Sequence, residues 1–120
     1  MKGPSGRQER LDGCVYEGAF KNDLFNGHGK LTNPTTSASY EGDWLNGQMH
    51  GSGLYLWADG RRYQGEYKQD KKDGFGVYMW ANGRTYYGMW RDGVQNGEGT
   101  KVQPNMDMKK SFWVNGKEAE

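Results

Sequence analysis

The 120-residue chain has few of the side chains from which metal and nucleophilic sites are usually built. It contains one cysteine, Cys14, and two histidines, so neither an internal disulfide nor a zinc cluster of cysteines and histidines can form. Its 16 basic and 15 acidic residues give a formal net charge of +1, which provides no overall attraction to nucleic acid or to an anionic membrane. No apolar run reaches the roughly 18 residues of a membrane-spanning helix, and residues 1–13 lack the apolar stretch of a signal peptide. Together these shortages favour a protein of a reducing compartment over a secreted, membrane-spanning or metal-dependent one.

Glycine and aromatic residues are abundant instead. Glycine occupies 20 of the 120 positions, compared with about 7% in average proteins, and aromatic residues make up 14%. The hydrophobic fraction of 33% and the mean hydropathy of -1.09 are typical of disordered chains, but such chains are also depleted in aromatic residues. The combination therefore indicates one small domain with many turns, in which rings pack over bare backbone.

A unit of glycines and aromatics recurs along the chain. Each unit opens with the pattern Y-x-G-x-aromatic, and a G-x-G pair follows in its second half. The opening tyrosines are Tyr16, Tyr40, Tyr63 and Tyr86, which are spaced 24, 23 and 23 residues apart. A fifth unit is expected at residue 109, where Lys109 and Ser111 replace the tyrosine and the glycine while Trp113 keeps the aromatic place. A decayed copy of this kind is typical of the end of a repeat array.

Both halves of each unit have the length of a β-strand, and turn residues separate them. Asn46-Gly47 lies between the two halves of the second unit, and Asp59-Gly60 lies between the second and third units. Glycine interrupts every segment that could otherwise show helical periodicity. The sequence thus predicts an all-β protein, an elongated single-layer antiparallel sheet of tandem β-hairpins. Four repeats are expected over residues 14–107, a degenerate fifth as a cap over 108–120, and a polar, flexible segment over 1–13.

Strand alternation assigns the residues of each unit to faces. Tyr40, Gly42 and Trp44 fall on one face of the predicted sheet, and Glu41 and Asp43 fall on the other. Rings of one strand are expected to cover glycines of its neighbours, because a position without a side chain leaves room for a ring to lie flat on the sheet. Ten glycines are assigned this structural role: Gly18, Gly42, Gly51, Gly53, Gly65, Gly74, Gly76, Gly88, Gly97 and Gly99.

The unit resembles the MORN repeat (membrane occupation and recognition nexus). The stretch from Tyr40 to Trp44, followed by His50-Gly51-Ser52-Gly53, is close to the ideal form of that repeat, and the resemblance extends over about residues 14–116. The histidine place is filled by Asn26, Asp73 and Asn96 in the other units. The resemblance implies an elongated, twisted single sheet with a groove along one face. It also implies a cytoplasmic location in association with the cytoskeleton or a cilium, and self-association is common among such proteins.

No enzyme is predicted. Catalysis needs polar groups that converge in a pocket shielded from water, and a single layer of hairpins has little interior. His50 occupies a place that holds asparagine or aspartate in the other units, which suits a hydrogen-bonding role and not a metal ligand or a general base. The G-x-G pairs do not precede a helix, so they do not form a phosphate-binding loop. No cofactor and no metal are expected.

The predicted function is a scaffold that binds a partner protein along the aromatic face. Some rings should stay accessible because a single layer cannot cover both of its faces, and tyrosine and tryptophan are common interface anchors. The predicted groove, which would hold an extended or helical peptide, comprises Tyr40, Trp44, Tyr55, Trp57, Tyr63, Tyr67, Tyr78, Trp80, Tyr86 and Trp90. The open sheet edges favour a homodimer or edge-to-edge association as well.

The alternative function is a peripheral membrane adaptor that uses the basic turns. Each basic residue close to an anionic surface contributes about 1 kcal/mol, and phosphoinositide binding has been proposed for the MORN family. The candidate lipid-binding residues are Arg61, Arg62, Lys68, Lys71, Lys72 and Arg84. Acidic residues such as Glu66 and Asp70 are interleaved with them, which is typical of solvated turns. Nucleic-acid binding by base stacking on the aromatics is disfavoured by the neutral net charge.

Overall fold

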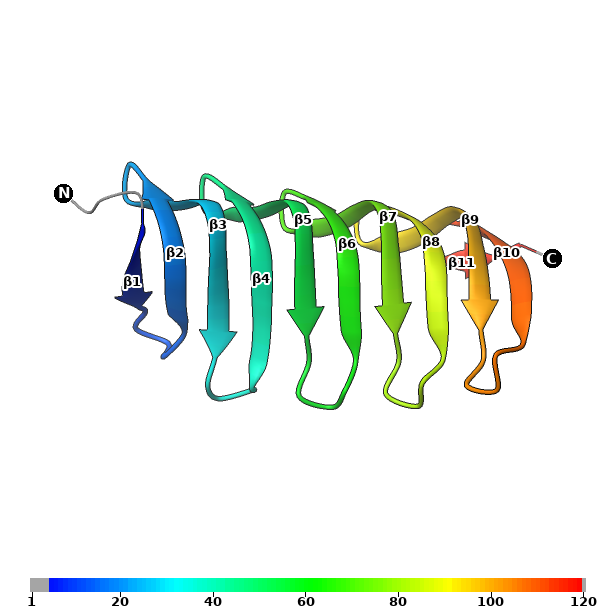
Figure 1. The fold of residues 1–120 in the computed structure, drawn as a ribbon. Helices are drawn as coiled ribbons and strands as arrows, with labels where there is room; N and C mark the ends of the chain where they lie inside the picture. The colour runs from blue at the N-terminus through cyan, green and yellow to red at the C-terminus, as the bar shows by residue number, and fades with distance from the viewer. Residues whose placement is uncertain (1–4, 120) are drawn as a thin grey trace.

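A computed structural model describes residues 5–119 as one open antiparallel sheet of 11 strands, which follow one another in sequence order (Figure 1). The strands are β1 (Ser5–Glu9), β2 (Val15–Lys21), β3 (Leu24–Asn33), β4 (Ala38–Leu45), β5 (Gln48–Leu56), β6 (Arg62–Lys68), β7 (Lys71–Met79), β8 (Thr85–Arg91), β9 (Val94–Val102), β10 (Met108–Val114) and β11 (Lys117–Glu118). The molecule measures 54 × 24 × 20 Å. The predicted all-β fold, an elongated single layer of hairpins, is confirmed. Within residues 5–119 there is no helix that could cross a membrane.

Each repeat contributes one hairpin, and the predicted turn residues form its tip. Asn46 and Gly47 join β4 to β5 with φ values of 50° and 85°, and Asp92 and Gly93 join β8 to β9 with 49° and 89°. Two-residue hairpin turns of the primed type need a positive φ at both positions, which asparagine, aspartate and glycine tolerate best. The turn chemistry of the sequence therefore fixes where each strand ends.

Part of the polar N-terminal segment lies in the sheet. Ser5–Glu9 forms β1, which pairs antiparallel with β2 from Ser5 opposite Ala19 to Glu9 opposite Val15. Backbone pairing does not depend on side-chain polarity, so a polar segment can satisfy the N–H and C=O groups that β2 would otherwise expose. Gly6 lies opposite Gly18, so the strand also fits against a glycine position. Residues 1–4 lie outside the described part of the chain.

The second strand of each of the four repeats contains a β-bulge, which lies opposite the residue that follows the Y-x-G glycine of the first strand. In the β4–β5 ladder Gly42 pairs with Gly53 and Trp44 pairs with Met49, so Asp43 alone on β4 faces His50, Gly51 and Ser52 on β5. The Tyr40 hydroxyl donates a hydrogen bond to the Asp43 carbonyl oxygen at 3.1 Å. The same bond joins Tyr16 to Ala19, Tyr63 to Glu66 and Tyr86 to Met89, at 2.8, 2.9 and 3.2 Å. The opening tyrosine of each repeat thus satisfies the carbonyl that the bulge removes from regular pairing.

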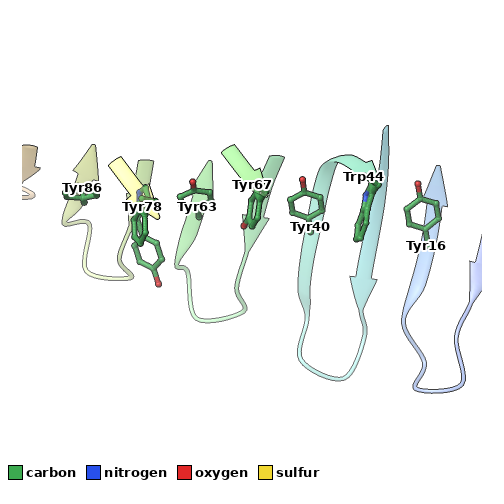
Figure 2. Packing of buried hydrophobic residues seen from close by; sticks show 8 residues of the cluster. Tyr16, Tyr40, Trp44, Tyr63, Tyr67, Tyr78 and Tyr86 are labelled. Carbon is green, nitrogen blue, oxygen red and sulfur yellow. The ribbon is translucent and has the colours of Figure 1, made fainter. Parts of the chain in front are cut away.

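The tyrosine rings lie on the second glycine of each G-x-G, as the sequence predicts. The prediction is wrong for Gly51, Gly74 and Gly97, because a Cβ atom on these glycines would meet Asp43, Glu66 and Met89 on the opposite face. A Cβ atom built on Gly53 would overlap the Tyr40 ring, and one on Gly76 would overlap the Tyr63 ring. Figure 2 shows Tyr16, Tyr40, Tyr63 and Tyr86 following one another along the sheet, one on each hairpin. These four side chains are fully buried or nearly so. A glycine is required at the second place of each G-x-G because the ring occupies the volume of a side chain.

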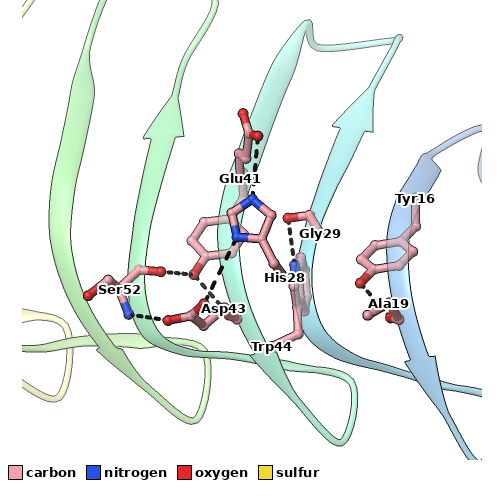
Figure 3. A network of polar contacts seen from close by, with 9 residues as sticks. Tyr16, Ala19, His28, Gly29, Glu41, Asp43, Trp44 and Ser52 are labelled. Atoms are coloured by element: carbon pink, nitrogen blue, oxygen red, sulfur yellow. Dashed lines mark hydrogen bonds and ion pairs between the residues drawn. The ribbon is translucent and has the colours of Figure 1, made fainter. Parts of the chain in front are cut away.

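Indole groups join the second and fourth hairpins to the hairpins that precede them. The Trp44 indole N–H donates to the Gly29 carbonyl oxygen at 3.0 Å (Figure 3), and the Trp90 indole N–H donates to that of Gly76 at 3.4 Å. Trp44 also packs edge-on against Tyr40, with 5.1 Å between the ring centres. The core is therefore a continuous line of buried aromatics, namely Tyr16, Tyr40, Trp44, Tyr63, Tyr67, Tyr78, Tyr86 and Trp90.

Candidate interaction groove

In the structure, fewer aromatic residues are accessible to a partner than the sequence predicts for the groove. Seven of its ten aromatics are buried in the core and are not available to a partner: Tyr40, Trp44, Tyr63, Tyr67, Tyr78, Tyr86 and Trp90. These rings are buried because each one covers a glycine or packs against a ring that does. Tyr55 and Trp57 are partly exposed, and Trp80 is 37% exposed. The accessible part of the aromatic face therefore comes from the second strands, β5 and β7, and the loops that follow them.

The accessible rings of Tyr55, Trp57 and Trp80 form a continuous strip together with the ring of Tyr78. The ring centres of Tyr55 and Trp57 are 4.4 Å apart, those of Trp57 and Tyr78 are 5.6 Å apart, and those of Tyr78 and Trp80 are 4.8 Å apart. Tyr78 itself is buried, so it connects two accessible ends. The strip crosses from the second repeat to the third.

Hollows lie along the same face, and we refer to them together as the aromatic groove. The first is lined by Phe25, Leu31, Tyr40, Trp44, Met49 and Tyr55, the second by Met49, Tyr55, Trp57, Tyr67, Asp70 and Lys72, and the third by Trp80, Arg84, Lys101, Val102, Trp113 and Glu118. Because the first two share Met49 and Tyr55, they are continuous. The groove follows the long axis of the sheet and crosses its strands.

Two cations lie against the rings of the groove. Arg61 places its guanidinium 5.0 Å from the ring centre of Trp57, donates to the Tyr78 hydroxyl at 3.4 Å, and pairs with Asp59 at 2.8 Å. Lys72 is partly buried, and burial together with the nearby Arg61 charge lowers the pKa of its ammonium. Lys72 is held on this face because it lies directly opposite Tyr67 across β6 and β7.

The candidate lipid-binding residues do not form one surface. Arg62 and Lys68 lie at opposite ends of β6, which separates the cations of the loop before β6 from those of the β6–β7 turn. Arg62 also faces away from Arg61, because successive side chains of a strand point to opposite faces. Lys72 turns into the aromatic groove, and Arg84 lines the third hollow. Only Lys68 and Lys71 remain together, exposed at the β6–β7 turn beside Asp92.

The opposite face carries a feature that the sequence reading missed. Phe75, Tyr87, Met89 and Phe112 are 49%, 44%, 40% and 51% exposed, and Phe75 pairs directly with Met89 across β7 and β8. In the first two repeats the middle positions of the Y-x-G and G-x-G motifs are polar, and His28 lies between Glu41 and Asp43 at 3.5 and 4.0 Å (Figure 3). Comparing the middle residues of each Y-x-G and G-x-G motif across the repeats would have revealed this change.

Comparison with known proteins identifies the repeat. The family model of the MORN repeat matches residues 16–37, 40–61, 63–83 and 86–107, and each match begins at an opening tyrosine. Alsin from Rattus norvegicus is 40% identical over 53 residues, which is 41% of this chain and 3% of alsin, so the chain spans only a small part of the length of that relative. The MORN repeat is a non-catalytic module for interaction with proteins or membranes. Because its model matches more than half of the chain, this chain belongs to the MORN repeat family.

Proposed function

We propose that this chain is a non-catalytic scaffold that holds a segment of a partner protein in the aromatic groove. The observation that carries the proposal is the strip from Tyr55 to Trp80, in which partly exposed rings stay in contact across two repeats. Tyrosine and tryptophan provide large, rigid contact areas and are enriched among residues that dominate binding energy. The family resemblance supports a cytoplasmic role within a cytoskeletal or ciliary assembly.

The spacing of the repeats suits a linear partner segment. Adjacent strands lie about 4.8 Å apart, so equivalent places on successive hairpins are about 10 Å apart along the groove. A helix advances about 10.5 Å in seven residues, and an extended segment advances about 10 Å in three. A helical partner would therefore contact successive hollows with every seventh residue, and an extended one with every third.

Truncation of the accessible rings tests the proposal. Partners are captured from a lysate and identified by mass spectrometry, and each purified partner is then titrated against Trp57→Ala, Trp80→Ala and the matched control Phe112→Ala. Either tryptophan change should weaken binding by about tenfold or more, because hot-spot truncations typically cost over 1 kcal/mol. Phe112→Ala should bind like the wild type, because Phe112 is exposed on the opposite face. Circular dichroism must show that each variant stays folded. If a partner is lost only with Phe112→Ala, the binding site lies on the opposite face and the proposal is contradicted.

The second candidate is a peripheral membrane adaptor, which the membrane-interacting character of the MORN family supports. Lys68 and Lys71 are exposed side by side at the β6–β7 turn and could meet anionic headgroups together. Sedimentation with phosphatidylserine vesicles at low and moderate salt tests this function. Salt-sensitive binding that is lost in Lys68→Ala/Lys71→Ala would support it, and equal sedimentation of the wild type and the variant would contradict it.

A further inference from the structure

One place in the groove changes its chemistry from repeat to repeat. This place lies two positions before each G-x-G, and its side chain is on the aromatic face. In the four repeats it is occupied by Phe25, Met49, Lys72 and Gln95. Phe25 stacks flat on Tyr16, with 3.7 Å between ring centres, so an apolar side chain fits this place well. Among the four matched repeats, the third is the one that puts a charge there.

The Lys72 ammonium is surrounded by four aromatic rings. Its nitrogen lies 5.4 Å from the ring centres of Tyr63 and Trp90, and 5.7 Å from those of Trp57 and Tyr78. Cations within about 6 Å of a ring centre are attracted by the electron-rich face of the ring. The rings therefore hold the ammonium in place, but they carry no negative charge to neutralise it.

No acidic side chain of residues 5–119 forms an ion pair with Lys72. The charged group that lowers the pKa of its ammonium is a second cation, Arg61, whose own carboxylate partner is Asp59. A partly buried charge without a counter-ion is costly, and a nearby like charge adds to that cost. Asp70 lines the same hollow, but its carboxylate accepts a hydrogen bond from the Met49 N–H at 2.7 Å and forms no ion pair with Lys72. The third repeat thus presents an unpaired ammonium within an aromatic wall.

The fifth unit shows how the same architecture neutralises such a cation. Lys101 lies 5.9 Å from the ring centre of Trp113, and its ammonium pairs with Glu118 at 2.7 Å. Glu118 follows Gln95 by one repeat length, so it occupies the place that Lys72 holds in the third repeat. In the fifth unit the Lys101 ammonium therefore has both an indole ring and a carboxylate as neighbours. Lys72 has the rings but no carboxylate.

We propose that Lys72 is the residue of the aromatic groove that recognises charge, and that it binds an aspartate or glutamate side chain of the partner segment. This inference rests on the proposed function, since it specifies the segment that the groove takes. Apolar side chains on either side of the acidic residue pack on Tyr55, Trp57 and Trp80. A single carboxylate matches the charge of the site, because Asp59 already balances Arg61 and leaves one unpaired cation. A phosphate monoester, with a charge close to two, would exceed it.

Peptide selection with a paired set of variants tests the inference. A random-peptide display library is selected on the full chain, and a selected peptide is synthesised with its acidic residue and with the corresponding amide. We expect acidic residues flanked by apolar ones to be enriched. The amide form should bind about tenfold or more weakly, because it loses a charge-assisted bond. Lys72→Met should lower the affinity for the acidic form to that for the amide, and Lys72→Arg should retain most of the difference.

Lys72→Met is a suitable variant because Met49 fills the same place in the second repeat. It should melt at the wild-type temperature or above, since it removes an unpaired, partly buried charge. Lys110→Met, on the exposed opposite face, is the matched control for a change in net charge and should leave peptide affinity unchanged. The difference between acidic and amide peptides should also shrink as salt rises.

The outcomes separate this inference from the proposed function. Selected peptides that need Trp57 but show no acidic preference and bind Lys72→Met normally would overturn the inference and leave groove binding intact. Peptides that are insensitive to both Trp57→Ala and Trp80→Ala would overturn the proposed function itself. The role of Lys72 would also be reassigned if phosphatidylserine vesicles bound the wild type and not Lys72→Met, or if Lys72→Met dissociated a dimer of the chain.

Discussion

At the scale of single residues, the opening tyrosine of each repeat has two separate roles. Its ring fills the space over a glycine of the next strand, and its hydroxyl donates a hydrogen bond to the carbonyl that lies opposite the bulge. A phenylalanine could perform the first role and not the second. The two contributions can therefore be measured separately by substitution.

Tyr63→Phe should destabilise the sheet by about 1 kcal/mol, because the Glu66 carbonyl loses a hydrogen bond of 2.9 Å while the ring packing stays. In thermal unfolding this corresponds to a fall in Tm of roughly 4 °C. Tyr87→Phe is the control, since Tyr87 is 44% exposed on the opposite face, and it should change stability by less than about 0.5 kcal/mol. Equal melting of the two variants would show that the hydroxyl is not needed at the bulge.

Gly42→Val and Gly65→Val should each destabilise the protein by about 3 kcal/mol or more. A Cβ atom on Gly42 would overlap the Gly53 Cα and the Ser52 carbonyl, and it would lie 2.7 Å from the Tyr40 hydroxyl. The obstacle is thus chiefly the backbone of the neighbouring strand, whereas the ring itself covers Gly53. Chemical denaturation measures the loss. Ser52→Val, on the exposed face of β5, should cost little, and a glycine variant that is as stable as this control would contradict the packing described here.

At the scale of elements, each hairpin turn docks on the preceding hairpin. The Gly116 N–H donates to the Gln95 carbonyl oxygen at 2.8 Å, and the Asn115 N–H donates to the Asn96 side chain at 2.9 Å. Asn26 and Asp73 accept the corresponding bonds from the turns of the second and fourth repeats. Three of the four side chains at the histidine place therefore have the hydrogen-bonding role that the sequence suggests for it, and His50 is the exposed fourth.

Asn96→Ala should loosen the β10–β11 turn without unfolding the rest of the sheet. It removes the side-chain acceptor of one turn, for which the expected cost is about 1 kcal/mol. Hydrogen exchange should quicken at residues 115–118 and stay unchanged in β4 to β7, because contacts pass only between neighbouring hairpins. Gln64→Ala, an exposed change on β6, serves as the control. If hydrogen exchange became faster in all hairpins alike, the unfolding of one repeat would be coupled to that of distant repeats, which would contradict this prediction.

Much of this arrangement is predictable from the sequence, because glycine and tyrosine mark its positions directly. The period, the turn at Asn46-Gly47 and the rings over Gly53 all follow from motif spacing and strand alternation. The bulge in β5 opposite Asp43 is not predictable in this way, since Met49, Gly51 and Gly53 alternate in the sequence as in a regular strand. The β1 strand forms by backbone pairing that no side-chain pattern records. Lys72 resembles a solvated turn residue until its neighbours in space are known.

At the scale of the whole molecule, stability depends on keeping a line of phenols neutral. Burial raises the pKa of the hydroxyls of Tyr16, Tyr63 and Tyr86 above the ordinary value of 10.0. In the unfolded chain the same groups ionise near pH 10.0, so ionisation favours unfolding. Their contribution to stability is therefore complete below about pH 10 and is lost as the pH rises through the folded-state pKa.

Alkaline titration should consequently show tyrosinate absorbance and loss of β-structure together. Both should appear above pH 10 in one cooperative step for Tyr16, Tyr63 and Tyr86, whose hydroxyls are buried. Ultraviolet absorbance and circular dichroism on the same samples measure the two events. Ionisation of all tyrosines near pH 10 with the sheet intact would contradict the burial of the phenols.

The strictly sequential strand order also determines how the molecule should respond to tension. β1 and β11 lie at opposite ends of the strand order, and the ladder bonds run along the line between those ends (Figure 1). A pull along that line acts parallel to the ladder hydrogen bonds, so it opens the outermost pair of strands first. It does not shear all pairs of strands at the same time. An optical trap should therefore record low-force peeling, with each hairpin of about 23 residues releasing up to roughly 80 Å of contour length. A protein of this shape would act as an extensible tether that lengthens in steps under load.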